Sequence, residues 1–192
     1  MKICVYGAAS KEIAESFKEA GYALGKEMAT RGHSLIFGGG DNGMMGAAAR
    51  GVHAGGGHVT GIQPSFFNVD GLLYPLCDEY IYTETMHERK QKMENMSDGF
   101  VITPGGVGTY DEFFEIFTLK QLGRHKKPIV ILNTNGYFDP LLALLRHTVE
   151  EHFMSERNLS LFLVTDDVKK ALDYLENPDD IEIDVEALRN IK

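Results

Sequence analysis

Short apolar runs that lead through a turn of small residues into a helical pattern recur three times. This recurring strand–turn–helix pattern constrains the fold more than any other feature of the sequence. The apolar runs lie at residues 3–6, 34–37 and 100–102, and the turns follow them at 7–10, 38–46 and 104–109. Because strands that alternate with helices form open, largely parallel sheets, we expect an α/β fold. In such a sheet the turns gather at the carboxyl ends of the strands, where ligands bind.

The remaining patterns complete a single predicted domain over residues 1–192. Further strands are predicted at 58–62, 80–82, 128–132 and 161–164. Helices are predicted at 10–31, 47–54, 83–96, 109–122 and 139–153, and a last one from 166 or 167 to about 175. Ser10 is the predicted N-cap of the first helix. Residues 63–79 lack periodicity and are expected to form a loop that borders the ligand site. No repeat or linker divides the chain, and the structure of the acidic tail at about 177–192 stays open.

Charge and cysteine content exclude several classes of protein. Lys and Arg number 19 against 28 Asp and Glu, a net charge of −9, whereas general nucleic-acid and membrane-surface binders need a basic footprint. No apolar stretch approaches the ~18 residues of a membrane span, and the N-terminal run is too short for a signal peptide. Cys4 and Cys77 form no CxxC pair, and the seven histidines form no HxH or HExxH group. We therefore expect a cytoplasmic protein without a disulfide framework or a metal site.

The unit at residues 100–112 is the strongest candidate site. Glycines at a strand–helix junction leave the first N–H groups of the helix free, and the positive end of the helix dipole favours an anion there. Thr109 and Glu112 would add a hydroxyl and a carboxylate beside that anion. Two interpretations of Glu112 stay open. Thr109 and Glu112 fit a capping box, and Glu112 is equally placed to act as a catalytic acid or base.

The other two turns offer weaker signals. Five glycines between residues 38 and 46 would let the backbone approach a ligand closely, but structural turns use glycine as well. Their spacing matches neither a dinucleotide fingerprint nor a Walker loop. The turn at 7–10 is either a ligand-facing loop or a plain turn with a helix cap.

The helix predicted at 83–96 carries two adjacent cations beside an apolar stripe. Met86, Met93 and Met96 share one face, and Arg89 and Lys90 project from the same side. Burying cations in that position costs free energy unless an anion pairs with them or the side chains extend far enough to keep their charged ends in water. We favour an anion for Arg89 and leave Lys90 open.

Three motifs lie in a specific order and spacing along this chain. Residues 38–46 read GGGDNGMMG, residues 86–90 read MHERK and residues 104–112 read PGGVGTYDE. Together they resemble the GGGxxGLMG run, the arginine motif and the PGGxGTxxE motif of the LOG ("lonely guy") family. The likeness extends from residue 3 to about 164, nearly the whole predicted domain.

The resemblance implies a Rossmann-like, three-layer nucleotide-binding domain that forms a homodimer. It implies hydrolysis of the N-glycosidic bond of nucleoside 5′-monophosphates, cytokinin riboside monophosphates or AMP, to a free base and ribose 5-phosphate. The family's catalytic pair corresponds to Arg89 and Glu112, and no cofactor or metal is implied. The residues expected to bind substrate are Ser10, Gly39, Gly40, Met86, Arg89, Lys90, Gly105, Gly106, Val107, Gly108, Thr109, Asp111 and Thr118.

Two other functions compete with this one. Related Rossmann-like proteins carry molybdenum cofactor, and a non-catalytic nucleotide or molybdenum-cofactor binder would use the same glycine cradle. Proteins with this motif are also often called lysine decarboxylases, but that chemistry needs a lysine Schiff base with pyridoxal phosphate, and no lysine context here supports one. The presence of both Arg89 and Glu112 favours the hydrolase.

Three departures from the family pattern bear on base preference rather than on the reaction class. Asp111 stands where many relatives have Glu, and Ala8 and Ala9 replace a more polar pair. The 63–79 loop lacks a glutamate that some plant members place near the base.

The apolar helix at 110–122 either packs in the core or forms the dimer interface, and the sequence leaves both open.

Overall fold

A single parallel sheet forms the centre of the computed structural model, which describes residues 1–67, 72–179 and 184. The strand order is β4-β3-β2-β1-β5-β6-β7, and every neighbouring pair runs parallel. The strands are β1 (Lys2–Tyr6), β2 (Ser34–Phe37), β3 (Val59–Pro64), β4 (Glu79–Thr83), β5 (Gly99–Ile102), β6 (Ile129–Leu132) and β7 (Leu163–Thr165). The predicted α/β fold with a parallel sheet is confirmed.

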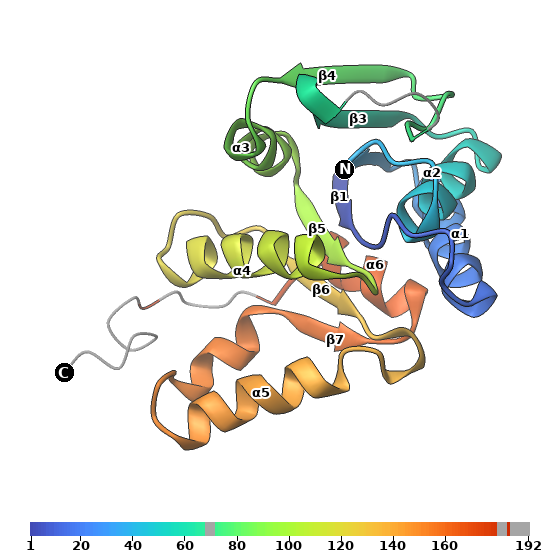
Figure 1. The fold of residues 1–192 in the computed structure, drawn as a ribbon. Coiled ribbons are helices and arrows are strands. Elements are labelled where there is room, and N and C mark those ends of the chain that lie inside the picture. The colour runs from blue at the N-terminus through green and yellow to red at the C-terminus, as the bar shows by residue number, and fades with distance from the viewer. Residues whose placement is uncertain (68–71, 180–183, 185–192) are drawn as a thin grey trace.

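Six helices cover the two faces of this sheet in the described part of the chain (Figure 1). They are α1 (Glu15–Thr30), α2 (Gly43–Ala54), α3 (Met86–Met96), α4 (Val107–Gln121), α5 (Asp139–Glu150) and α6 (Val168–Glu176). Helices α1, α2 and α6 pack on one face, and α3, α4 and α5 pack on the other. Helix, sheet and helix therefore form three layers.

The strand side chains divide between two cores by simple alternation. On β1, Ile3 and Val5 pack toward α1 and α2, while Cys4 and Tyr6 pack toward α3 and α4. All four of these side chains are buried, as expected for a parallel strand covered on both faces. The central strands are thus fixed from both sides, and their carboxyl ends form a rigid edge.

The direction of strand order reverses at β1, which pairs with β2 on one side and β5 on the other. Chain segments after β1 and β5 separate at such a point and leave a crevice for a ligand. Hydrogen bonds hold the two segments in register below it: Ala8 N donates to Pro104 O at 3.0 Å, and Thr103 Oγ1 donates to Tyr6 O at 2.8 Å.

Several predicted boundaries are wrong, and Ser10 is the clearest case. Helix α1 begins at Glu15 with Ala14 as its N-cap, so Ser10 does not cap it. The Ser10 hydroxyl instead accepts a hydrogen bond from Glu12 N at 3.2 Å in a local turn, a competing use of serine near helix starts.

Two other segments were predicted imperfectly. Strand β7 begins at Leu163 because the preceding residues form a 3-10 helix, Glu156–Leu161. In the expected 63–79 loop, Ser65–Phe67 is a short 3-10 helix and β4 begins at Glu79. Residues 68–71 of that loop, and the tail at 180–183 and 185–192, lie outside the described residues.

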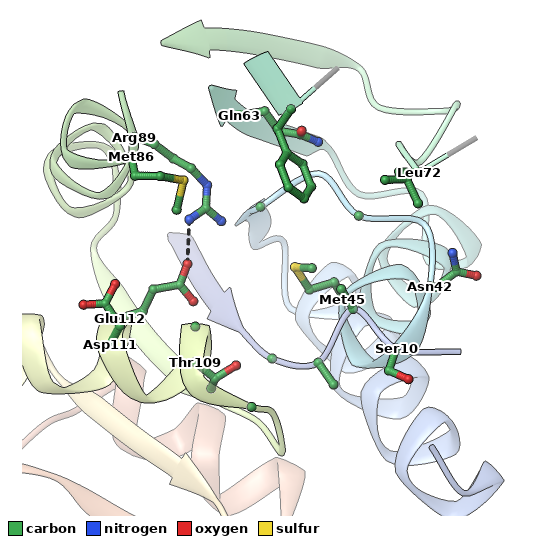
Figure 2. Close-up of a pocket in the computed structure, with 18 of the residues that line it drawn as sticks. Ser10, Asn42, Met45, Gln63, Leu72, Met86, Arg89, Thr109, Asp111 and Glu112 are labelled. Atoms are coloured by element: carbon green, nitrogen blue, oxygen red, sulfur yellow. Dashed lines mark hydrogen bonds and ion pairs between the residues drawn. The ribbon is translucent and has the colours of Figure 1, made fainter. Parts of the chain in front are cut away.

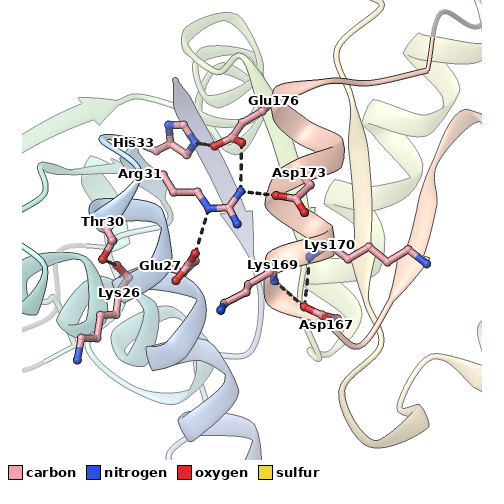
Figure 3. Close-up of polar contacts among 10 residues, drawn as sticks. All are labelled: Lys26, Glu27, Thr30, Arg31, His33, Asp167, Lys169, Lys170, Asp173 and Glu176. Atoms are coloured by element: carbon pink, nitrogen blue, oxygen red, sulfur yellow. Dashed lines mark hydrogen bonds and ion pairs between the residues drawn. The ribbon is translucent and has the colours of Figure 1, made fainter.

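An ion-pair network joins α6 to the end of α1 (Figure 3). Arg31, the C-cap of α1, pairs through Nη1 with Asp173 at 2.6 Å and with Glu176 at 3.1 Å. Its Nε pairs with Glu27 at 3.0 Å, and His33 Nε2 lies 2.7 Å from Glu176 Oε1. Networks contribute more than isolated surface pairs because one ordered cation serves several carboxylates.

We expect Arg31→Met to lower the free energy of unfolding by about 1–2 kcal/mol, since three carboxylates lose their shared cation. Urea unfolding followed by circular dichroism measures this change, and the loss should shrink as salt is added. Arg157→Met, at an exposed position, is the matched control and should cost less than about 0.5 kcal/mol. Equal losses in the two variants would contradict a structural role for the network.

Candidate active site

A cavity of about 590 Å³ lies at the carboxyl ends of the central strands. Its walls come from the turns after β1 and β2, the end of β3, and helices α3 and α4. Figure 2 shows Arg89 and Glu112 on one side of it, with Met45, Leu72 and Gln63 on the other. The cavity therefore has a charged side and a largely apolar side.

A buried ion pair joins α3 to α4 at the charged side. Arg89 Nη1 donates to Glu112 Oε1 at 2.7 Å, and both side chains are only 10% exposed. Arg89 Nε donates to Ile62 O at the end of β3, at 3.1 Å. Glu112 Oε2 has no hydrogen-bond partner among the described residues, so this oxygen is available to a molecule in the cavity.

The environment of Glu112 changes its acidity. Burial raises the pKa of Glu112 above its ordinary value of 4.5, and the adjacent Arg89 guanidinium offsets this only in part. A carboxyl with a raised pKa in a cavity is typical of groups that accept or donate protons.

The junction between β5 and α4 is a strand–turn–helix unit, the local structure for which the sequence predicts an anion site. Gly106 is the N-cap of α4 in an extended conformation (φ −92°, ψ −154°), and Val107 is the first helical residue. The first N–H groups of α4 therefore have no partner within the helix, and Gly106, Gly108 and Thr109 line the cavity there. Tyr137 Oη supports this turn from outside by donating to Gly105 O at 2.7 Å.

The capping-box interpretation of Thr109 and Glu112 is wrong. Thr109 is the third residue of α4 rather than its cap, and Glu112 is the sixth. The helix begins earlier because Gly106 adopts the extended cap conformation itself. The Glu112 carboxylate is thereby free of the helix start, and Arg89 binds it instead.

The glycine-rich turn after β2 lies at the cavity, where Gly38 and Gly40 line it, and it also leaves room for two side chains. A Cβ atom at Gly38 would lie 2.3 Å from Arg89 Nη2, and a Cβ at Gly39 would lie 2.5 Å from Gln63 Nε2. Gly39 also has a positive φ of 80°. Glycine at these two positions therefore makes room for functional side chains as well as bringing backbone to the cavity.

Lys90 faces α4 rather than the cavity. Its Nζ lies 3.0 Å from Asp111 Oδ2 and 2.9 Å from Glu115 Oε2. Burial lowers the pKa of Lys90, but the ion pairs with Glu115 and Asp111 outweigh it and the net shift is upward. Lys90 thus stays charged and holds α3 against α4 beside the catalytic candidates.

The structure brings together most of the residues predicted to bind substrate. The predicted residues that line the cavity are Ser10, Gly40, Met86, Arg89, Gly106, Gly108, Thr109, Asp111 and Glu112. The predicted residues that do not line it are Gly39, Lys90, Gly105, Val107 and Thr118. Val107 is 83% exposed, and Thr118 lies on the exposed side of α4.

Sequence reasoning placed the 63–79 loop at the border of the site, but it named neither the apolar side chains nor the one polar side chain that line the cavity there. Met45, Phe67 and Leu72 line the cavity, and so does Gln63 at the end of β3. The signal for Gln63 was a polar residue directly after the predicted strand 58–62, whereas β3 itself extends to Pro64 and includes Gln63. Phe67 and Leu72 lie in the segment without periodicity and Met45 lies in the first turn of α2, so only the folded chain brings these apolar residues together.

Pyridoxal phosphate does not suit the side chains that line this cavity. No lysine lines the cavity among the described residues, so a Schiff base has no amine to form on. Three or more His, Cys, Asp or Glu side chains that could share a metal ion do not come together anywhere in the described chain.

Among the helices of the described residues, none is both long and apolar enough to cross a membrane.

Comparison with known proteins identifies the family. A family model described as "Possible lysine decarboxylase" matches residues 45–175. The rice (Oryza sativa subsp. japonica) protein named cytokinin riboside 5′-monophosphate phosphoribohydrolase LOG is 40% identical over 155 residues, covering 81% of this chain and 64% of the relative. This chain belongs to the LOG family. The LOG3 protein of Arabidopsis thaliana, also named as such a phosphoribohydrolase, is 37% identical over 175 residues, covering 91% of this chain and 81% of the relative.

Solved structures share the fold. The molybdenum cofactor carrier protein of Chlamydomonas reinhardtii has a TM-score of 0.69 at 26% identity and covers 91% of this chain and 95% of its own. The molybdenum cofactor binding protein of Rippkaea orientalis has a TM-score of 0.70 at 20% identity, with 91% and 94% covered, which speaks for the fold alone. The chain spans just under two thirds of the length of the first two rice relatives, at 64% and 63%.

We expect Arg89→Met to destabilise the protein by about 3 kcal/mol near neutral pH, because it leaves the buried Glu112 carboxylate without its cation. A carboxyl whose pKa is higher in the folded than in the unfolded state destabilises the fold as pH rises between the two values. The loss measured by urea unfolding should therefore be smaller at pH 5 than at pH 8.

The double variant Arg89→Met, Glu112→Gln is the control, because it removes the charge that lacks a partner. It should recover part of the lost stability at pH 8. Equal destabilisation of Arg89→Met at both pH values would contradict the dependence of the Glu112 charge on Arg89.

Proposed function

We propose that this protein hydrolyses the N-glycosidic bond of nucleoside 5′-monophosphates, cytokinin riboside monophosphates or AMP, to a free base and ribose 5-phosphate. The observation that carries the proposal is the buried Arg89–Glu112 pair, which lies between an anion-binding helix start and an apolar wall. A nucleotide has the same order of parts: phosphate, ribose, base.

The phosphate is assigned to the start of α4. Free N–H groups and the helix dipole favour a phosphate there, and Thr109 adds a hydroxyl. Arg89 Nη2 lies beside Gly38 and has no hydrogen-bond partner among the described residues. It is therefore free to hold a ribose or phosphate oxygen and so fix C1′ against Glu112.

Glu112 is assigned the chemical step. Breaking the bond between C1′ and the base nitrogen builds positive charge on the sugar, as in glycosidases, and a carboxylate beside C1′ stabilises that charge. Glu112 also takes a proton from the water that adds to C1′. The bonding electrons leave with the base, which takes up a proton in turn, so the reaction balances without a cofactor.

The relatives support this assignment through their names, which describe cytokinin riboside 5′-monophosphate phosphoribohydrolases in rice and Arabidopsis thaliana. These relatives are 37–40% identical to this chain, which covers 64% of the rice protein and 81% of the Arabidopsis thaliana protein. The preferred base of this chain is therefore proposed rather than taken from their names.

A second candidate function is cofactor carriage without catalysis. The Chlamydomonas reinhardtii carrier matches over nearly its whole length at 26% identity and is named as a molybdenum cofactor carrier. The buried Arg89–Glu112 pair, with one carboxylate oxygen left free, favours the hydrolase, because a positioned carboxylate with a raised pKa is suited to proton transfer.

Replacing either member of the pair should abolish turnover. We expect Glu112→Gln and Arg89→Ala to lower kcat for adenine release from AMP at least about 100-fold, the usual loss when a general base or a charge-stabilising group is removed. Chromatography of the products measures the release. Glu19→Gln, an exposed position on α1, is the control for the same substitution and should match the wild type.

Two results would contradict the proposal. One is a wild-type protein that releases no base from any of a panel of nucleoside monophosphates. The other is tight binding of molybdenum cofactor, measured by calorimetry, in a protein without turnover, which would favour the carrier function.

We further propose that the protein is a homodimer that uses the outer face of α4. Phe114 and Leu122 are 38% and 37% exposed on that face, and Thr118 lies between them along the helix. The inner face of the same helix packs Phe113 and Phe117 into the core, so the core interpretation holds for one side of the helix only.

Light scattering should give twice the chain mass of 21.3 kDa. Phe114→Asp should shift the mass toward one chain, because a charge would lose its water at the interface. A single-chain mass for the wild type at micromolar concentration would contradict the dimer.

A further inference from the structure

Gln63 is a buried polar side chain without a partner in the cavity wall. It is only 2% exposed, it lines the cavity, and its Oε1 makes no hydrogen bond in the described part of the structure. Buried acceptors are nearly always satisfied, since leaving one without a partner costs free energy. The exception at Gln63 points to a ligand that supplies the missing hydrogen bond.

Gln63 directly follows, in the chain, a residue that binds one of the two catalytic candidates. The preceding residue, Ile62, accepts the hydrogen bond from Arg89 Nε at 3.1 Å. Gln63 Nε2 lies against the backbone of Gly39, where a Cβ atom would be 2.5 Å away. The carboxamide is therefore confined between β3 and the turn after β2, close to Arg89 but on the opposite side from the start of α4.

The surroundings of Gln63 suit a flat apolar ring with a polar edge. Met45, Phe67 and Leu72 line the cavity together with Gln63, and Phe67 and Leu72 are half-exposed. In Figure 2 the labelled side chains run from Gln63 past Arg89 and Glu112 to Thr109. With the phosphate at Thr109 and C1′ at Glu112, the base lies at the Gln63 end.

We propose that Gln63 is the specificity-determining residue that reads the 6-amino group of the purine, an inference that rests on the proposed hydrolase function. Its Oε1 accepts from the N6–H of the base, while its Nε2 donates to the adjacent ring nitrogen, N7. This two-bond pairing is the usual one between a carboxamide and adenine. An N6-alkylated adenine keeps one N6–H and still satisfies Oε1, whereas a 6-oxopurine presents two acceptors on that edge.

The test compares Gln63→Met with the wild type on three substrates: AMP, IMP and purine riboside 5′-monophosphate, which lacks a 6-substituent. Methionine keeps the length of the side chain but makes no such hydrogen bonds. We expect kcat/KM for AMP to fall about 10- to 100-fold, the discrimination of one two-bond amide pair. The values for IMP and purine riboside monophosphate should fall less, because these bases keep N7 but offer no N6–H to Oε1, so the wild-type preference for AMP narrows.

A second measurement separates recognition from a structural role. Removing an unsatisfied buried carboxamide should raise the melting temperature of the substrate-free protein, by about 2–4 °C for a domain of this size. Gln91→Met, at an exposed position on α3, is the matched control and should leave both the melting temperature and the three kcat/KM values unchanged.

Unchanged AMP turnover in Gln63→Met would overturn the inference while the proposed function stands. So would an equal loss on all three substrates together with a lower melting temperature, which would mark Gln63 as structural. A wild-type protein that cleaves none of the three substrates would instead overturn the proposed function, and the inference with it.

Discussion

The ion pair between Arg89 and Glu112 is the constraint on which the rest of the site depends. It joins α3 to α4 across the point where strand order reverses, and a third hydrogen bond ties Arg89 to the end of β3. Two buried charges are tolerable only in good geometry, so the surrounding backbone must conform to them. Glycine at position 38 follows from this, because any side chain there would meet the guanidinium.

The same constraint divides the cavity into parts with different chemistry. Below the pair, the start of α4 offers N–H groups and a hydroxyl for a phosphate, and beyond it an apolar wall with one carboxamide offers a place for a base. Glu112 lies between them with one oxygen free and a raised pKa. Each part alone is common in proteins. Their order along the cavity matches the order of phosphate, ribose and base in a nucleotide, and this match is the basis of the proposed substrate.

Local patterns predicted the fold well because strand and helix signals depend on nearby residues. The parallel sheet and the strand–turn–helix junction after β5 were predicted from the residues, and Arg89 and Glu112, singled out by the family motifs, lie together in the cavity. Two predictions that required knowing the partner of a side chain were wrong. Ser10 was assigned to a helix it does not cap, and Glu112 was read in part as a cap although Arg89 binds it.

By itself, the sequence determined the succession of strands and helices along the chain, the glycine-rich turns and the motif residues, because periodicity and backbone freedom are properties of short segments. Only the tertiary structure decided which side chains share the cavity. It turned Lys90 toward Asp111 and Glu115 and placed Gln63 in the wall of the cavity that Arg89 also lines. Glycine at positions 38 and 39 leaves room for the Arg89 and Gln63 side chains. The physical reason is that pairing and desolvation depend on distances between segments far apart in the chain, which no local pattern encodes.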